Sequence, residues 1–231
     1  MKSEDTILSA IAGFVDTLSF VALFGLFTAH VTGNFVLIGA GVAGFGRGVL
    51  LKLIVFPAFV GGVVVSSLLV RSLSERHARQ GSRLLHTVQA VLMFGYCLAG
   101  VWATPVTQPE SFAVTVAGIV GAFAMGVQNA HPKLIKRASV PNTVMTGNVT
   151  QAILDAVDML SADTSESVRD VARARFATML PAIVAFAIGA IAGALGYRHM
   201  GFWALLAPAF ALVALAMTTG EHERAATPGH A

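Results

Sequence analysis

The chain has 231 residues, of which 55% are hydrophobic and only 12% are charged, and its mean hydropathy is +0.75. A soluble domain carries about a quarter charged residues and could not bury this much apolar surface at this length, so the composition predicts an integral membrane protein. The net charge of +3 does not indicate nucleic-acid binding, because the basic residues stand in short runs between apolar segments, as membrane topology requires.

Six apolar stretches approach the roughly 20 residues that a helix needs to cross a bilayer. In chain order they are Ile7–Phe27, Val49–Val70, Leu84–Ala103, Phe112–Ala130, Phe176–Tyr197 and Phe202–Thr218. Two further segments, Gly33–Ala43 and Asn148–Leu160, have a helical pattern but are too short to span, since the first covers only about 16 Å as a helix. We therefore predict an all-α membrane protein with six transmembrane helices and two short re-entrant helices.

A single transmembrane domain is expected over residues 7–219, with an N-terminal tail at 1–6 and a disordered C-terminal tail at 220–231. The segment Arg71–Arg83 holds four arginines, whereas Thr104–Ser111 holds no lysine or arginine. Because basic loops remain in the cytoplasm, an even number of spans would leave both termini cytoplasmic.

The tripeptide Thr-Gly-Asn occurs at 32–34 and again 114 residues later at 146–148, each time opening a short helix. In both places an apolar span precedes it, and a span that opens with Pro-Ala and one more span follow. Each half, about 7–103 and 112–219, thus has three spans, and an odd number makes the second half enter the membrane from the opposite side. This order predicts two inverted repeats, as in many transporters, although coincidence remains the alternative for so short a match.

Parts of the chain resemble the YoaK-type family of bacterial inner-membrane proteins. The blocks that carry the resemblance are Gly13 to Asp16, His30 to Asn34, Gly126 to Asn129 and Thr143 to Asn148. The similarity extends from about Ile7 to Thr218. It implies a multi-span protein of the bacterial inner membrane, and it implies no reaction or substrate because the family is a domain of unknown function.

The Thr-Gly-Asn motif combines features that suit a solute site at a helix start. A threonine hydroxyl can cap free N–H groups, glycine lets a ligand approach the backbone, and asparagine both donates and accepts. Two such N-termini meeting in the membrane would each carry about half a positive charge and attract an anion or a polar group. The plainer alternative is that the motif only caps and packs its helix. The candidate solute-binding residues are Thr32, Gly33, Asn34, Thr146, Gly147, Asn148, Gln128 and Asn129.

Asp16 is the most informative single residue, because a charge at the centre of a span costs about 2.5–3.5 kcal/mol on insertion scales. It predicts proton coupling or, alternatively, a hydrogen-bonded group that holds helices together. His30 is a candidate proton relay or an interfacial residue. Gln128 and Asn129 at the end of the fourth span suit either a polar cavity or inter-helix hydrogen bonds.

The predicted function is a secondary transporter or facilitator for a small polar or anionic solute, bound between the two half-helix N-termini. The alternative is a non-transporting membrane scaffold or accessory subunit. No metalloprotease, nucleophile-elbow or phosphate-loop motif occurs, so we expect no enzyme, cofactor or metal. The expected partners are the solute and the lipid bilayer, with a homo-oligomer left open and no nucleic acid.

Overall fold

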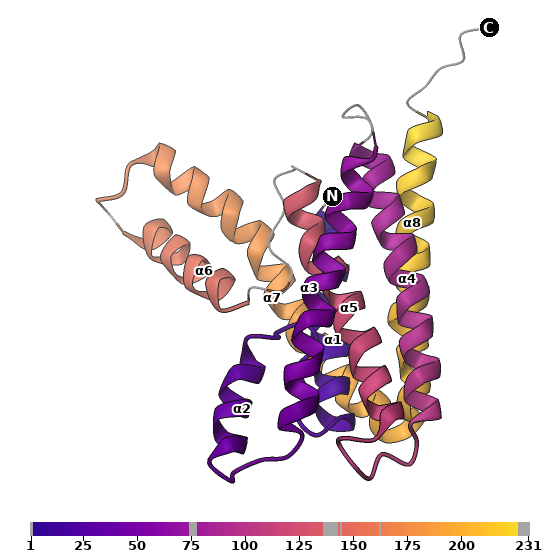
Figure 1. Ribbon diagram of the computed structural model, residues 1–231. Coiled ribbons are helices and arrows are strands. Elements are labelled where there is room, and N and C mark those ends of the chain that lie inside the picture. Colours follow the sequence, from indigo (N-terminus) through magenta and orange to yellow (C-terminus); the bar gives the residue numbers. More distant parts are fainter. Residues whose placement is uncertain (1, 74–77, 136–142, 144, 162, 226–231) are drawn as a thin grey trace, which may run out of the picture.

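The computed structural model describes residues 2–73, 78–135, 143, 145–161 and 163–225, which form helices and their connections without any strand. The elements are α1 (Lys2–Ala22), α2 (Gly33–Val42), α3 (Val49–Arg71), α4 (Ala78–Trp102), α5 (Phe112–Leu134), α6 (Met145–Leu160), α7 (Glu166–Met200), the 3-10 turn η1 (Gly201–Leu205) and α8 (Leu206–Ala225) (Figure 1).

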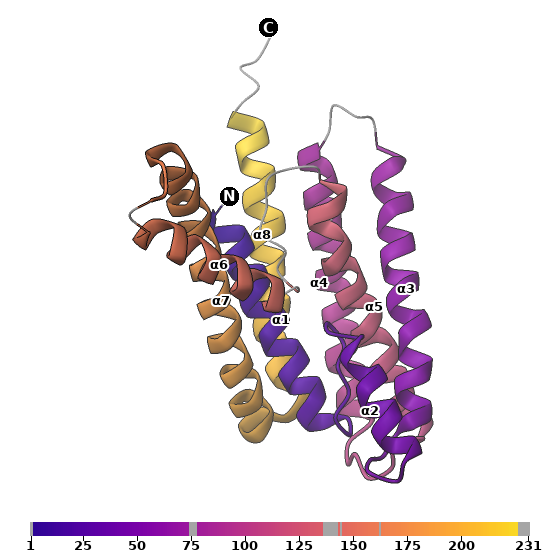
Figure 2. The same cartoon turned by 90° about the vertical axis from the view of Figure 1, so that its left-hand side faces the viewer.

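Several of these helices are long and apolar enough to cross a membrane, which confirms the all-helical membrane class. There are five such stretches in the described part of the chain, namely Glu4–Ala22, Val49–Arg71, Gln80–Trp102, Phe112–Leu134 and Glu166–Thr218. The fifth has 53 residues and includes α7, η1 and most of α8. Its direction reverses at η1, where Gly201 has a φ of 58°, and Figure 2 shows α8 running back antiparallel to α7.

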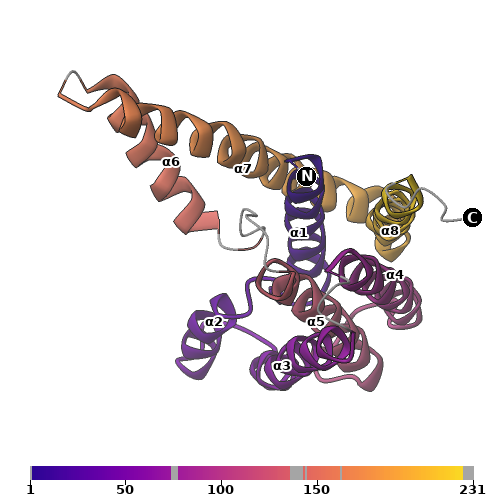
Figure 3. The same cartoon turned by 90° about the horizontal axis from the view of Figure 1, so that it is seen from above.

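The long helices form a bundle with roughly aligned axes (Figure 1). In this bundle α1 packs mainly on α7, α3 packs on α5, and α4 lies between α5 and α8. The N-terminus and the C-terminal end of α8 lie at the same end of the bundle. Helix α6 and the first part of α7 project sideways from it (Figure 3), because α7 has 35 residues, about 52 Å, and exceeds the roughly 30 Å of a hydrocarbon core.

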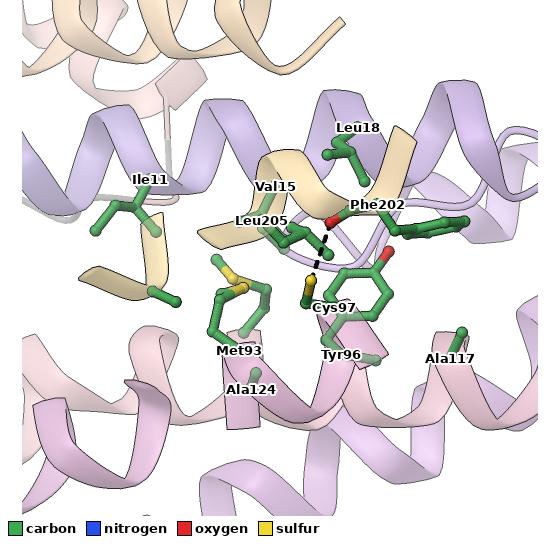
Figure 4. Close-up of a cluster of buried hydrophobic side chains, with 14 of the residues drawn as sticks. Ile11, Val15, Leu18, Met93, Tyr96, Cys97, Ala117, Ala124, Phe202 and Leu205 are labelled. Carbon is green, nitrogen blue, oxygen red and sulfur yellow. Dashed lines mark hydrogen bonds between the residues drawn. The ribbon is translucent and has the colours of Figure 1, made fainter. Parts of the chain in front are cut away.

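Large apolar side chains from α4 and η1 fill the centre of the bundle (Figure 4). Met93, Tyr96, Phe202 and Leu205 are all buried, and α1 and α5 close over them. The thiol of Cys97, which is also buried, donates to the carbonyl oxygen of Phe202 at 3.3 Å. These contacts fix η1 against α4 and so determine where α7 turns into α8.

Two helix pairs approach so closely that their backbones touch at glycines. Gly13, Gly189 and Gly193 lie at the α1–α7 contact, and Gly62 and Gly126 lie at the α3–α5 contact. At each of these positions a Cβ atom would overlap a carbonyl oxygen of the facing helix. Small residues of this kind let membrane helices associate through close van der Waals packing, so these glycines act within the chain.

Both ends of the chain are more helical than we expected. Helix α1 begins at Lys2 and Glu4 is buried, which corrects the tail expected at residues 1–6. Hydropathy misses this turn because its acidic side chains lie mostly within the fold, where Glu4 pairs with His86. Helix α8 continues to Ala225, so the first part of the tail expected at 220–231 is helical and the remainder lies outside the described residues.

The first helix ends earlier than expected, at Ala22 instead of Phe27. Phe24 and Gly25 adopt φ values of 55° and 74°, in the left-handed region that terminates a right-handed helix. The chain then turns back alongside α1 before α2 begins. The apolar run predicts a continuous span here because hydrophobicity carries no sign of this reversal.

Candidate functional site

Asp16 is a buried carboxylate that holds the segment leading into α2. Its Oδ1 accepts hydrogen bonds from the backbone N–H groups of Thr28 at 2.7 Å and Ala29 at 2.8 Å, and its Oδ2 lies 2.7 Å from Nδ1 of His30. Only 3% of Asp16 is exposed, and hydrogen bonds to an ionised acceptor are among the strongest in proteins. The two residues expected to couple protons are therefore direct partners, and Asp16 also anchors the fold.

His30 is placed by this pair in contact with a second helix, α7. Nδ1 of the ring is the nitrogen that faces the carboxylate, and Nε2 is the second nitrogen that can donate or accept a hydrogen bond. The His30 side chain is 30% exposed, and its ring meets Phe186 of α7 edge-on, with 5.4 Å between centroids. The site thus joins α1, the returning segment and α7.

A second layer of polar groups fixes Thr28. Its hydroxyl lies 3.1 Å from Oγ of Ser19, which in turn lies 2.8 Å from the hydroxyl of Tyr96 on α4. Ser19 and Thr28 are fully buried, and Ser19 also donates to the carbonyl of Val15 at 2.7 Å. Because Thr28 is held through both its backbone and its side chain, the position of the neighbouring His30 depends on the hydrogen bonds that join this segment to α1 and, through Tyr96, to α4.

Asn34 of the first motif binds the backbone of the returning segment. Its Oδ1 accepts from the N–H of Phe27 at 2.9 Å, and its Nδ2 donates to the carbonyl of the same residue at 2.7 Å. Only an amide side chain offers the acceptor and donor that a peptide group needs for this double contact. Asn34 is 2% exposed, so its observed contacts are those of a residue that holds the start of α2 in place.

The N-terminal amides of α2 are already paired. The N–H groups of Gly33, Asn34 and Phe35 donate to carbonyl oxygens three residues earlier. Thr32 is exposed, has helical angles and makes no side-chain cap hydrogen bond, so its expected N-cap role is wrong. At α2 a solute would therefore meet side chains and the helix dipole, since these three amides are engaged within the chain.

Asn129 connects the two segments that precede the two motifs. Its Nδ2 donates to the carbonyl of Met125 at 3.2 Å and to that of Ala29 at 3.4 Å, and its Oδ1 accepts from the hydroxyl of Thr143. Ala29 belongs to the first segment and Thr143 to the second. Among the candidate residues, Asn129 is thus the one that brings both halves of the chain to one point.

The second motif begins inside α6, which starts at Met145 and so includes Thr146 and Gly147. The two motifs have the same pattern of burial. Thr146 is exposed, as Thr32 is, and Asn148 is buried at 3% exposure, as Asn34 is. In Figures 1 and 2, α2 and α6 start part-way along the bundle; α2 runs toward the end opposite the N-terminus, whereas α6 projects sideways. Within the described residues the two short helices do not pack on each other; α2 packs on α3, and α6 packs on α7.

Gln128 faces away from the motifs. Its Nε2 donates to the carbonyl of Leu8 at 2.7 Å, and its Oε1 accepts from Nε2 of Gln89 at 2.6 Å. All three helices involved, α1, α4 and α5, meet at this buried amide. The observed contacts of Gln128 are therefore inter-helix hydrogen bonds.

Lys52 is a buried cation that the sequence does not single out, because a lysine at the start of a span reads as a topology marker. Its Nζ donates to the carbonyls of Phe24 at 2.8 Å and Arg47 at 2.7 Å, and the residue is 3% exposed. The ammonium group thereby holds together the two turns that flank α2.

An ion pair links α6 to α7, on which it packs. Nη2 of Arg175 donates to Oδ1 of Asp155 at 2.6 Å, and its Nε donates to the same oxygen at 3.1 Å. The Asp155 side chain is fully buried, whereas that of Arg175 is 45% exposed. A buried carboxylate that loses its cation is strongly destabilised, so this pair determines how firmly α6 is held.

Arg175→Gln is expected to loosen α6 without unfolding the bundle, because it leaves the buried Asp155 without a cation. Hydrogen exchange of the amides in α6 should become at least about tenfold faster. The matched control is Arg173→Gln. Arg173 also pairs with a carboxylate, that of Asp170 at 3.5 Å, but both side chains are exposed, at 67% and 64%, so this pair should contribute little. Equal exchange in both variants would show that the Asp155 pair contributes little to the docking of α6.

The comparisons with known proteins agree with the family resemblance. The family described as "Protein of unknown function (DUF1275)" matches residues 6–218. The chain is 25% identical over 161 residues to the "UPF0700 transmembrane protein YoaK" of Bacillus subtilis (strain 168), which covers 66% of this chain and 67% of that protein. No solved structure matches the chain. With nearly the whole bundle and both motifs inside the matched region, the chain belongs to the DUF1275 family of YoaK-type transmembrane proteins.

Proposed function

We propose that this protein is a proton-coupled secondary transporter or facilitator for a small polar or anionic solute in a bacterial inner membrane. The observation that carries the proposal is the placement of Asp16 and His30. The Asp16 carboxylate on α1 contacts the imidazole of His30 in the segment that leads into α2, and this partly exposed imidazole faces Phe186 of α7. Ionisable groups inside a membrane protein are costly and are typical of proton and solute pathways.

An inverted repeat is supported by the way the helices pair. If α1–α4 correspond to α5–α8, the α1–α7 contact corresponds to α5–α3, the α2–α3 contact to α6–α7, and α4–α8 to itself. Asp16 and Asn129, which both hold a segment that precedes a motif, are 113 residues apart, and the motifs are 114 apart. A twofold relation in the membrane plane would generate this pattern.

Six crossings with cytoplasmic termini fit the same arrangement. Counting α7 and α8 separately makes six long helices, which alternate in direction, so both termini fall at one end (Figure 1). The basic segment Arg71–Arg83 joins α3 to α4 at that end. We assign this end to the cytoplasm because basic loops are retained there.

The solute site proposed between the motif starts is built from exposed rather than buried groups. Thr32, Thr146 and Gly147 are exposed, whereas Asn34 and Asn148 are buried. The positive ends of the α2 and α6 dipoles favour an anion or a polar group, and His30, two residues before Thr32, adds a polar side chain near the start of α2.

The proposal is tested by ligand-induced stabilisation of the detergent-purified protein, screened against small anions, carboxylates and nucleobases. A solute present at 100 times its Kd should stabilise the fold by about 2.7 kcal/mol and so raise the unfolding temperature. His30→Gln and Thr146→Val should weaken the effect at least about tenfold, whereas Thr150→Val, an exposed change one turn along α6, should not. Identical ligand responses in all three variants would show that the solute does not bind in this region.

A second candidate is a non-transporting membrane scaffold, and the paired amides of α2 favour it because they leave no free N–H groups at Gly33, Asn34 or Phe35. Copurification with a stable partner, together with no solute-driven proton flux in proteoliposomes, would support this alternative. A proton flux that requires His30 would exclude it.

A further inference from the structure

Four polar side chains converge inside the end of the bundle where both termini lie. They come from three helices: Glu4 from α1, Ser82 and His86 from α4, and His131 from α5. Ser82 is 0% exposed, His86 is 1% exposed and His131 is 3% exposed, while the Glu4 side chain retains 12%. The cluster is thus buried, with its carboxylate next to the surface.

In both histidines Nε2 is the ring nitrogen that faces the carboxylate of Glu4, and both face the same oxygen, Oε1. Nε2 of His86 lies 3.0 Å from Oε1 of Glu4, and Nε2 of His131 lies 3.7 Å from it. The rings lie 4.7 Å apart between centroids with an interplanar angle of 24°, so they approach from one side. Oγ of Ser82 lies 2.9 Å from Nε2 of His131 and 3.3 Å from Oε1 of Glu4.

We propose that Glu4, His86 and His131 bind one divalent transition-metal ion, with zinc as the best fit. The three ligand atoms lie within 4.8 Å of one another. In a tetrahedral zinc site with bonds of 2.0–2.1 Å, neighbouring ligand atoms are about 3.3 Å apart, so the observed spacing needs only small side-chain movements. Two imidazoles and one carboxylate suit zinc, whereas magnesium and calcium require mainly oxygen ligands.

The remaining groups supply what a metal site needs around its ligands. Ser82 is placed to hydrogen-bond Glu4, as groups around a metal site commonly orient its ligands. The partial exposure of Glu4 gives the ion an access route from the surface. The bound ion would join the start of α1 to α4 and α5, so its direct effect is to stabilise that end of the bundle. This inference does not depend on solute transport.

The experiment uses the full chain, purified without a histidine tag and freed of metal by a chelator that is then removed. After dialysis against Zn²⁺, elemental analysis should give one zinc per chain, and Zn²⁺ but not Mg²⁺ should raise the unfolding temperature. Loading with Co²⁺ should produce the strong visible absorption of a four-coordinate site. Absence of bound zinc, of the stabilisation and of the Co²⁺ absorption in the unaltered protein would overturn the proposal and leave a hydrogen-bond network.

Variants assign the ligands. Glu4→Gln and His86→Asn should each weaken Zn²⁺ binding by about 100-fold or more, since even groups that only orient ligands change metal affinity 10–100-fold. His199→Asn is the matched control, because His199 is exposed at the end of α7. Unchanged zinc affinity in both ligand variants would also overturn the proposal. If a variant does not fold, the Co²⁺ spectrum of the unaltered chain shows whether a four-coordinate metal site exists.

Discussion

Asp16→Ala is expected to lower the free energy of unfolding by about 3 kcal/mol or more, because it removes the acceptor of two buried backbone N–H groups. The amides of Thr28 and Ala29 would lose the carboxylate oxygen that both of them contact, and His30 would lose its anion. The segment leading into α2 should then become mobile. Thermal unfolding in detergent and hydrogen exchange of the two amides measure the effect.

Asp16→Asn separates the structural role from the charge. The amide oxygen can still accept from Thr28 and Ala29, so most of the stability should remain, whereas the ionic contact with His30 is lost. Under the proposed function, this variant should fold and bind solute but no longer couple uptake to protons. If the alanine and asparagine variants unfold at the same temperature, the two amide hydrogen bonds do not anchor the segment.

Gly189→Ala is expected to be the most damaging of the small substitutions, at roughly 3 kcal/mol, the upper part of the usual cost of overpacking. The added Cβ would overlap the backbone of Ala10 on α1, which cannot move aside as a flexible side chain could. Separating α1 from α7 would also part Asp16 and His30 from Phe186. Thermal unfolding of the purified protein measures the loss.

The matched control is Gly39→Ala in α2, where a Cβ would meet nothing within 4 Å. Alanine is the better helix former by about 1 kcal/mol, so this variant should be as stable as the parent or slightly more stable. Equal destabilisation by the two substitutions would mean that the close α1–α7 contact is not what Gly189 provides.

The candidate site was only partly predictable from the sequence. Asp16 stood out because ionisable groups are rare within apolar spans, and His30 because it lies two residues before the first motif; the structure makes them direct partners. Their pairing depends on the reversal at Phe24 and Gly25, which hydropathy does not reveal. The 113-residue spacing of Asp16 and Asn129 was a visible signal of their related roles, although only the contacts with Ala29 and Thr143 explain it.

The zinc candidate was outside the reach of sequence reasoning for a similar reason. Glu4, His86 and His131 are up to 127 positions apart and form no spaced motif. Glu4 also stands in a polar turn that resembles a solvated tail. Their convergence exists only because α1 and α4 begin, and α5 ends, at the same end of the bundle.

Composition and hydropathy by themselves determined the membrane class and the apolar helices, because the cost of placing polar groups in lipid depends on each residue type. The motif blocks in the sequence indicated the family. Tertiary structure alone decided where the chain reverses, which polar groups become partners and which glycines touch a facing backbone. These features depend on contacts between residues far apart in the chain. In a membrane, such contacts form through close packing and hydrogen bonding rather than through hydrophobicity, so the hydropathy pattern does not record them.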